Sequence, residues 1–348
     1  MVIVKKKGKL KSIFSIILLV VIAGLVLYFS LKDDYKEILN GIINANKLWL
    51  LLAVVLIFGY WFFKALIFFR FTRKFKKDYK FKKAFKLQLL TNFFNAITPF
   101  SSGGQPFQIY TLKKQGVELT ASTSIIIQNF IVYQIALVSL GIISIISNSI
   151  FHFFEDVQIL NYLVTIGFII NTLIIIGLFL IAFAKKFNKF VIGKSIKILS
   201  KTKIVKDEEK TLNNWHEYIN NFHEGAKLLI ADKGFFARAI LDAFLALLCQ
   251  YLIPVIILYS TGDYTSFNGL TSIVACSYVM LIGSFVPIPG GTGGLEYSFI
   301  QFYGNFVGGS TLRVIMILWR AVTYYLGLIL GAIVVNFKEK EKEEEECA

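Results

Sequence analysis

Long apolar runs alternate with short polar segments along most of the chain. Six of these runs approach or exceed the length that a helix needs to cross a lipid bilayer, which is about 20 residues. They are Ser12–Ser30, Leu48–Phe69, Thr120–Ile146, Ile159–Ala184, Phe235–Tyr259 and Leu312–Asn336. The pattern predicts an all-α integral membrane protein with six transmembrane helices.

Two further apolar segments are broken near their middle by proline and glycine. The first lies at about 84–112 and is broken at Thr98–Pro106, and the second lies at about 269–309 and is broken at Val286–Glu296. Four of the five prolines lie in these two breaks. Inside a membrane, the backbone groups freed by such a break must face protein or a polar cavity. Paired breaks in two halves of a chain are typical of the substrate site of a transporter.

Basic residues are concentrated in some connecting segments and absent from others. The segments Met1–Lys11, Arg70–Lys86 and Lys185–Lys233 are rich in lysine and arginine, whereas Ser147–Gln158 and Ser260–Asn268 contain neither. By the positive-inside rule, the basic segments and both termini lie in the cytoplasm.

This topology makes each broken segment return to the side from which it enters. Segment 84–112 becomes an inner re-entrant hairpin and segment 269–309 an outer one. Residues 1–146 and 147–336 then form two membrane repeats of inverted topology, followed by an acidic cytoplasmic tail at 337–348. We expect the tips near Gly103 and Gly291 to meet beside a polar cavity at the middle of the bilayer.

Composition supports a membrane protein. The chain is 56% hydrophobic with a mean hydropathy of +0.65, which excludes an ordinary soluble domain. Its net charge of +15 resides in loops, and no nucleic-acid-binding motif is present. The three cysteines and three histidines show no metal or nucleophile spacing, so we expect no cofactor and no metal. Segment 211–230 reads as a cytoplasmic amphipathic helix, either a connector or a lipid sensor.

The glycine runs are the first candidates for substrate binding. Gly103 and Gly104 precede one helical segment, and Gly290, Gly291, Thr292 and Gly293 precede another. Glycine exposes backbone N–H groups, and a helix N-terminus favours an anion such as phosphate. The alternative is that these glycines only allow a tight turn.

Polar side chains at membrane depth are the second candidates. Glu296 and Arg320 either form a structural ion pair, or Arg320 holds a lipid phosphate with its planar guanidinium. Gln105, Gln108 and Gln128 either line a cavity or bond one helix to another. Lys64 is expected to lie near the end of a span and to extend its ammonium group toward the interface.

The two broken segments resemble the flippase-like membrane domain of the lysylphosphatidylglycerol synthetase family. The resemblance rests on Thr98 through Tyr110 with Lys113, Lys114 and Gly116, on Pro287 through Glu296, and on Arg320 and Tyr324. It implies a protein of the bacterial inner membrane that moves an anionic or aminoacylated phosphatidylglycerol-type lipid between leaflets.

In that family a separate soluble domain attaches the amino acid to the lipid, and no segment here is long enough to form it. The membrane part of a phosphatidylglycerol lysyltransferase system, acting with a separate cytoplasmic aminoacyl transferase, therefore remains an alternative function. A non-transporting membrane scaffold is another. The expected partner is a membrane phospholipid, and the sequence leaves open whether the protein is a homo-oligomer.

Overall fold

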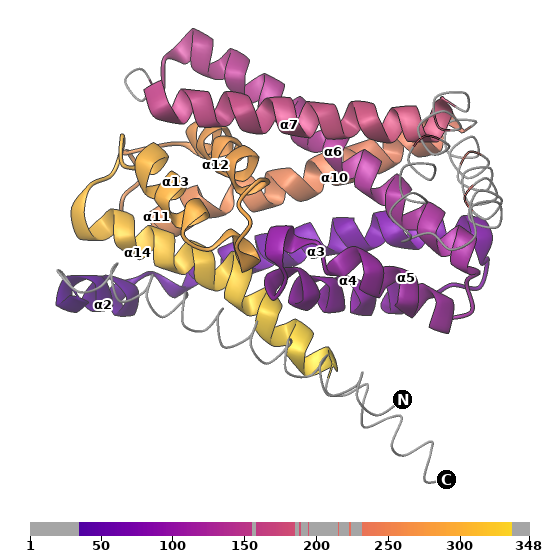
Figure 1. The fold of residues 1–348 in the computed structure, drawn as a ribbon. Coiled ribbons are helices and arrows are strands. Elements are labelled where there is room, and N and C mark those ends of the chain that lie inside the picture. Colours follow the sequence, from indigo (N-terminus) through magenta and orange to yellow (C-terminus); the bar gives the residue numbers. More distant parts are fainter. Residues whose placement is uncertain are drawn as a thin grey trace, which may run out of the picture.

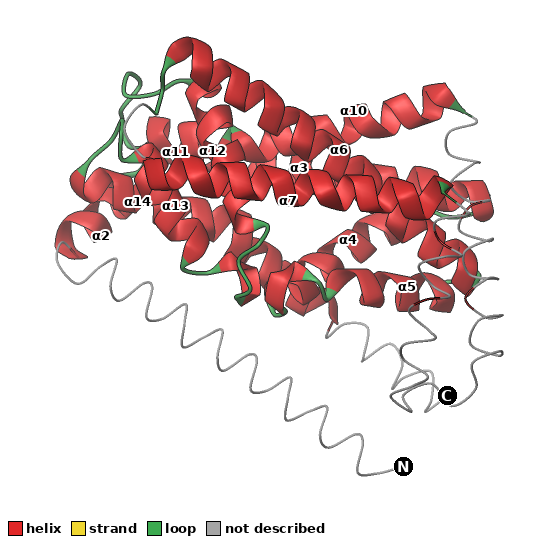
Figure 2. Cartoon of the chain, turned by 45° about the horizontal axis from the view of Figure 1, so that its top comes forward, coloured by secondary structure: helices red, strands yellow, loops and turns green. Residues whose placement is uncertain are grey.

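The computed structural model describes residues 35–154, 158–184 and 232–335, and the single residues 188, 194, 215 and 223. Every regular element in these ranges is helical (Figures 1 and 2). The first expected span at 12–30, most of the amphipathic segment 211–230 and the tail at 337–348 lie outside the described residues.

Five helices among the described residues are long and apolar enough to cross a membrane. They are α3 (Lys47–Phe75), α6 (Leu119–Phe151), the apolar part Leu160–Leu180 of α7 (Gln158–Phe183), the pair α10 (Lys233–Tyr251) and α11 (Ile253–Ser260), and the span Gly309–Val335, which begins with α14 (Gly309–Arg320). These helices correspond to five of the six expected spans. The chain is a multi-pass membrane protein.

Two of these spans contain an irregularity. The expected span Phe235–Tyr259 is interrupted at Leu252, just before Pro254 at the start of α11. Proline lacks an N–H, and its ring clashes with the carbonyl four residues earlier, which divides the helix. The last span contains a π-helical turn, η3 (Ala321–Tyr325), directly after Arg320. Such turns shift the face that the following side chains present, and they are frequent at functional sites.

The broken segments form two helical hairpins. The first consists of α4 (Phe81–Ala96), η1 (Pro99–Ser101) and α5 (Gly104–Lys114), and the second of α12 (Gly269–Gly283), η2 (Pro289–Gly291) and α13 (Gly294–Tyr303). In each hairpin the two helices pack against each other, and the two tips, η1 and η2, are in contact. Figure 1 shows the hairpins at opposite ends of the bundle, with α12 and α13 on the left and α4 and α5 on the right. The expected meeting of the tips is confirmed.

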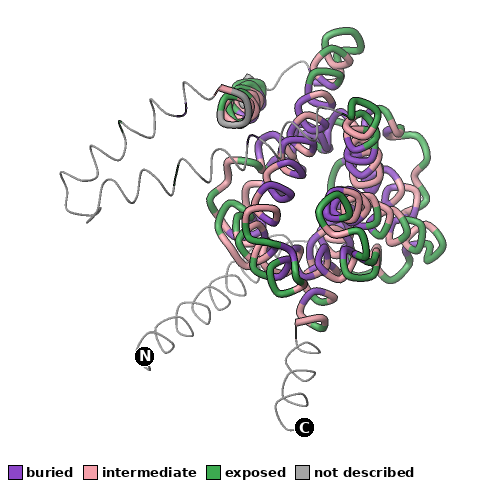
Figure 3. Tube along the Cα trace, turned by 90° about the vertical axis from the view of Figure 1, so that its right-hand side faces the viewer, coloured by how far each residue is buried: buried purple, intermediate pink, exposed green. Residues whose placement is uncertain are grey.

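The two halves of the described chain pack closely against each other. α3 lies along α10, and α6 lies along α12. Gly141 of α6 faces Leu281 of α12, and Gly331 of the last span lies so close to α4 that an added Cβ would sit 2.5 Å from the Leu89 carbonyl oxygen. Small residues permit such close helix packing in membranes. Figure 3 shows buried residues where the helices face one another and exposed residues on the outward faces. This packing is consistent with an inverted repeat, which stays a prediction.

A short helix that the sequence analysis did not predict precedes α3. α2 (Tyr35–Asn44) packs along α14, where Gly41 lies against Val314. Its Tyr35, Leu39 and Ile43 are exposed. Spaced one turn apart, these three side chains form an apolar stripe on one face of the helix.

Candidate functional site

A cavity of about 670 Å³ lies where the two hairpin tips meet the spans. Its walls come from both hairpins (α4, η1 and α5; α12, η2 and α13), from α3, α6, α7 and α10, and from the last span. Amide side chains dominate its polar lining: Gln88, Asn92, Asn95, Gln105, Gln108, Asn129, Gln134, Asn171 and Gln250. A space of this size with a polar lining inside a membrane bundle is suited to a polar ligand or to water.

The two tips share one backbone shape. Thr98 and Ile288 are extended, as expected before a proline. Pro99 and Pro289 follow, and each is followed by two residues with positive φ. These pairs are Phe100 (54°) and Ser101 (50°) in the first tip, and Gly290 (65°) and Gly291 (63°) in the second.

Matching hydrogen bonds stabilise both turns. Ser102 donates its hydroxyl to the Pro99 carbonyl at 2.9 Å, and Thr292 donates to the Pro289 carbonyl at 2.9 Å. Both tips therefore carry the pattern Pro-x-x-Ser/Thr-Gly-Gly, at 99–104 and 289–294. This repeat is visible in the sequence and was missed in the sequence analysis. It is direct residue-level evidence that the two breaks are related.

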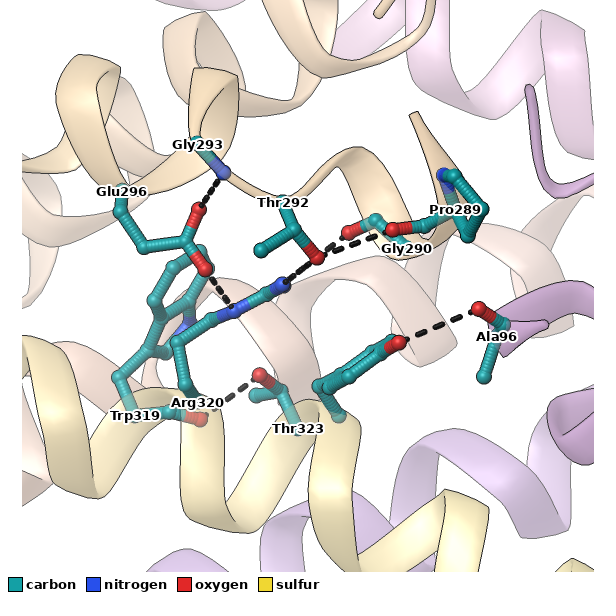
Figure 4. A network of polar contacts seen from close by, with 10 residues as sticks. Ala96, Pro289, Gly290, Thr292, Gly293, Glu296, Trp319, Arg320 and Thr323 are labelled. Atoms are coloured by element: carbon teal, nitrogen blue, oxygen red, sulfur yellow. Dashed lines mark hydrogen bonds and ion pairs between the residues drawn. The ribbon is translucent and has the colours of Figure 1, made fainter. Parts of the chain in front are cut away.

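The second tip is held by charged side chains (Figure 4). Arg320 Nε lies 2.7 Å from Glu296 Oε1, an ion pair in which both side chains are 6% exposed. The carboxylate also accepts a hydrogen bond from the Gly293 N–H at 2.7 Å, which caps α13. Arg320 Nη2 donates to the Gly290 carbonyl at 3.2 Å and to the Thr292 hydroxyl at 3.3 Å. The guanidinium group thus ties the last span to the tip.

The first tip is held by neutral side chains. The Gly103 N–H donates to Thr98 Oγ1 at 2.8 Å, and the Gly104 N–H donates to Asn95 Oδ1 at 2.9 Å. These bonds satisfy N–H groups that the start of α5 would otherwise leave free. The N–H groups of Gly103, Gly104 and Gly293 therefore already have acceptors within the protein. An anion would have to displace those acceptors to bind there.

Close packing explains several of the glycines. A Cβ on Gly104 would lie 2.3 Å from Asn95 Oδ1, and one on Gly290 would lie 2.2 Å from the Tyr324 ring. The Tyr324 hydroxyl in turn donates to the Ala96 carbonyl at 3.1 Å, at the end of α4. Gly290 thus allows Tyr324 to join the second tip to the first hairpin.

The structure places the predicted site residues in three groups. Gln105, Gln108, Gly290, Gly291 and Arg320 line the cavity. Gly103, Gly104, Thr292, Gly293 and Glu296 belong to the polar networks of the tips and are not among the lining residues. Gln128 is buried in α6 and donates to Ser124 Oγ at 2.8 Å, away from the cavity lining.

Several cavity amides have unused hydrogen-bonding capacity. Gln88 Oε1, Asn92 Nδ2, Gln105 Oε1 and Asn129 Oδ1 are buried without a hydrogen-bond partner. Other amides bridge helices: Gln134 of α6 donates to Asn171 of α7 at 3.1 Å, and Asn171 donates to Ser284 at 2.8 Å. Buried polar atoms without partners are costly, and a ligand or water in the cavity would satisfy them.

Lys64 was assigned wrongly from the sequence. The expected span ended at Phe69, but α3 continues to Phe75, so Lys64 lies within the helix and lines the cavity. Its Nζ lies 4.1 Å from the centroid of the Tyr133 ring. The sequence analysis missed the continuation of α3 through Arg70 and Thr72, because the basic residues at the end of this helix looked like a connecting segment. Arg70 itself pairs with Asp242 of α10, whose side chain is 9% exposed.

The chain is similar to known membrane proteins along nearly its whole length. The family model described as "Lysylphosphatidylglycerol synthase TM region" matches residues 15–331. A UPF0104 membrane protein of Archaeoglobus fulgidus is 28% identical over 306 residues, covering 84% of this chain and 88% of the relative. A UPF0104 membrane protein of Methanocaldococcus jannaschii is 24% identical over 359 residues, covering 96% of this chain and 97% of the relative.

Proposed function

Since the chain belongs to the family of the lysylphosphatidylglycerol synthase transmembrane region, we propose that it is a flippase-like phospholipid transporter. Its cargo would be an anionic or aminoacylated phosphatidylglycerol-type lipid, which it moves between the leaflets of a membrane. Any amino acid on that lipid would be attached by a separate cytoplasmic transferase.

One observation carries this proposal: a cavity with many amide side chains in its lining lies at the contact between two opposed hairpin tips. Moving a lipid headgroup through a bilayer requires a polar path, because an unpaired polar or charged group in hydrocarbon is costly. A scaffold has no need of such a space. The described part of the lining contains Lys64 and Arg320 and no aspartate or glutamate, so it favours an anionic headgroup.

The transport step we propose is an alternating opening of the two tips. In the described structure the tips touch, and the hydrogen bond from Tyr324 to Ala96 links the last span to the end of α4 in the first hairpin. Separation of one tip from the bundle would admit a headgroup from one side, and separation of the other would release it. Opposed broken helices at a shared site are the usual arrangement for such access.

We further propose that both termini face the cytoplasm. The described ends of α3, α4 and α5 at one side of the bundle carry a dense group of lysines and arginines, in agreement with the positive-inside rule. The resemblance suggested a bacterial inner membrane. Because the two relatives above come from archaea, the proposal is limited to a cell membrane.

The test is a leaflet-resolved translocation assay in vesicles of zwitterionic phosphatidylcholine with a trace of fluorescent phosphatidylglycerol. A membrane-impermeant reductant bleaches the label in the outer leaflet. We expect label from the inner leaflet to become accessible in vesicles that contain the protein and to stay protected in protein-free vesicles. Equal protection in both would contradict the proposal.

A further inference from the structure

The charges around the cavity are unevenly compensated. Among the described residues, Lys64 and Arg320 are the two charged side chains that line the cavity, and no described carboxylate lines it. Arg320 forms an ion pair with Glu296, and its Nη2 donates hydrogen bonds to the second tip. The charge of Arg320 is therefore largely compensated within the protein. The charge of Lys64 is not compensated in this way.

Lys64 has no acidic partner among the described residues. Its one recorded interaction is with the Tyr133 ring, 4.1 Å from Nζ. A cation over an aromatic ring gains a modest stabilisation, which grows as the cation is desolvated. A charged group at membrane depth is costly, and it usually pairs or marks a substrate path. The ring alone does not offset that cost.

The surroundings of Lys64 are suited to an anion. Tyr60 lies one turn before it on α3, and Asn129 lies one turn before Tyr133 on α6, so each pair shares one helix face. All four side chains line the cavity, and α3 packs against α6. The Asn129 amide nitrogen can donate to an anion, whereas its Oδ1, which is buried without a partner, can only accept a hydrogen bond. Hydroxyl, amide and ammonium groups together provide the donors that a phosphate needs.

We infer that Lys64, with Tyr60, Asn129 and Tyr133, forms an anion subsite that binds the phosphate of the lipid headgroup, and that Arg320 is a structural latch. This inference rests on the proposed function and assigns the charge selectivity of the transporter to α3 and α6. Free phosphate offers the same chemistry as the headgroup, so the test includes both sources.

Binding is measured first, in detergent, by thermal stabilisation of the full chain. The probes are phosphatidylglycerol, diacylglycerol without phosphate, and inorganic phosphate. We expect phosphatidylglycerol to stabilise the native chain and diacylglycerol to have little effect. Lys64→Gln should weaken the apparent affinity for phosphatidylglycerol at least tenfold, and Lys64→Arg should retain most of it. Stabilisation by inorganic phosphate alone would contradict a lipid headgroup as the ligand.

The matched control is Lys47→Gln, which removes the same charge from an exposed position at the start of the same helix. It should bind phosphatidylglycerol like the native chain. Without lipid, Lys64→Gln should melt at or above the native temperature, because it removes an unpaired cation. Lys64→Gln binding phosphatidylglycerol as tightly as the Lys47→Gln control would overturn the inference.

Translocation separates this inference from the proposed function. In vesicles, the native chain should move labelled phosphatidylglycerol faster than labelled phosphatidylcholine, and Lys64→Gln should lose that preference. Transport with an unchanged preference in Lys64→Gln would refute the subsite and leave the proposed function standing. Lys64-dependent binding without any translocation would refute the proposed function and leave the subsite standing.

Discussion

The two hairpin tips have the same turn but are stabilised in opposite ways. In the second tip, Pro289, Gly290 and Gly291 are buried, and the residues with positive φ are glycines. In the first tip no residue of η1 is buried, and the residues with positive φ are Phe100 and Ser101. For a residue other than glycine, a positive φ raises the conformational energy of the folded state by about 1 to 2 kcal/mol. The second tip is thus stabilised by charged side chains, whereas the first tip is strained and exposed.

This difference suggests unequal roles. A buried ion pair and a tight aromatic contact fix the second tip to the last span, whereas the first tip is held by neutral hydrogen bonds from Thr98 and Asn95. Backbone strain often lies where a structure changes its conformation. We therefore expect the first tip to open more readily than the second.

The largest effect is expected at the latch. Arg320→Met leaves the Glu296 carboxylate buried without its cation, and removal of one member of a buried pair costs about 3–5 kcal/mol. The double variant Arg320→Met, Glu296→Gln removes both charges and keeps an acceptor for the Gly293 N–H. We expect the single variant to lose that much unfolding free energy and the double variant to recover most of it, together with transport.

Chemical unfolding in detergent and the vesicle assay provide the two readouts. A double variant that regains stability but not transport would give Arg320 a direct role in binding the lipid. A double variant as unstable as Arg320→Met would show that the ion pair is not what fixes the tip.

Gly290→Ala comes next. The new Cβ would lie 2.2 Å from the Tyr324 ring, at a residue with φ of 65°. Overpacking costs about 1–3 kcal/mol and the backbone strain about 1 more. The control is Gly262→Ala, which has φ of 88° with open space around it and so measures strain alone. Equal melting temperatures for the two variants would rule out the tight contact with Tyr324.

Asn95→Ala tests the neutral latch of the first tip. It removes the acceptor of the Gly104 N–H, and loss of a hydrogen bond of this kind costs about 1 kcal/mol. The unfolding free energy should fall by about that amount, well below the loss in Arg320→Met. A loss as large as that of Arg320→Met would contradict the contrast between the two tips.

Phe100→Gly should have the smallest effect, with the opposite sign. Glycine removes the strain of the positive φ in the folded state, but it also increases the conformational entropy of the unfolded chain. The net effect is a stabilisation of about 0.5–1 kcal/mol. A rise in melting temperature with slower transport would show that the exposed Phe100 side chain is kept for function. A fall in melting temperature would mean that its side chain makes contacts that outweigh the strain.

The sequence was sufficient for the long helices and the two hairpins, because apolar length and paired Pro-Gly breaks are local signals. It was insufficient where a role depends on which face of a helix meets which neighbour. Gln128 and Gln134 lie on one apolar helix, yet the first bonds to Ser124 and the second lines the cavity. Lys64 was placed wrongly because the group of basic residues that follows it was taken to mark the end of α3. The pairing of Glu296 with Arg320 was one of two open alternatives that only packing could distinguish.

The most direct test of the account asks whether the lipid passes the cavity between the tips. Thr323 lines that cavity, and Thr323→Cys offers a site for a bulky methanethiosulfonate reagent whose disulfide can be reduced again. The native chain with its own cysteines, treated in the same way, is the control. We predict that modification stops phosphatidylglycerol translocation in Thr323→Cys alone and that reduction restores it. Unchanged translocation by the fully modified variant would contradict a route through the cavity.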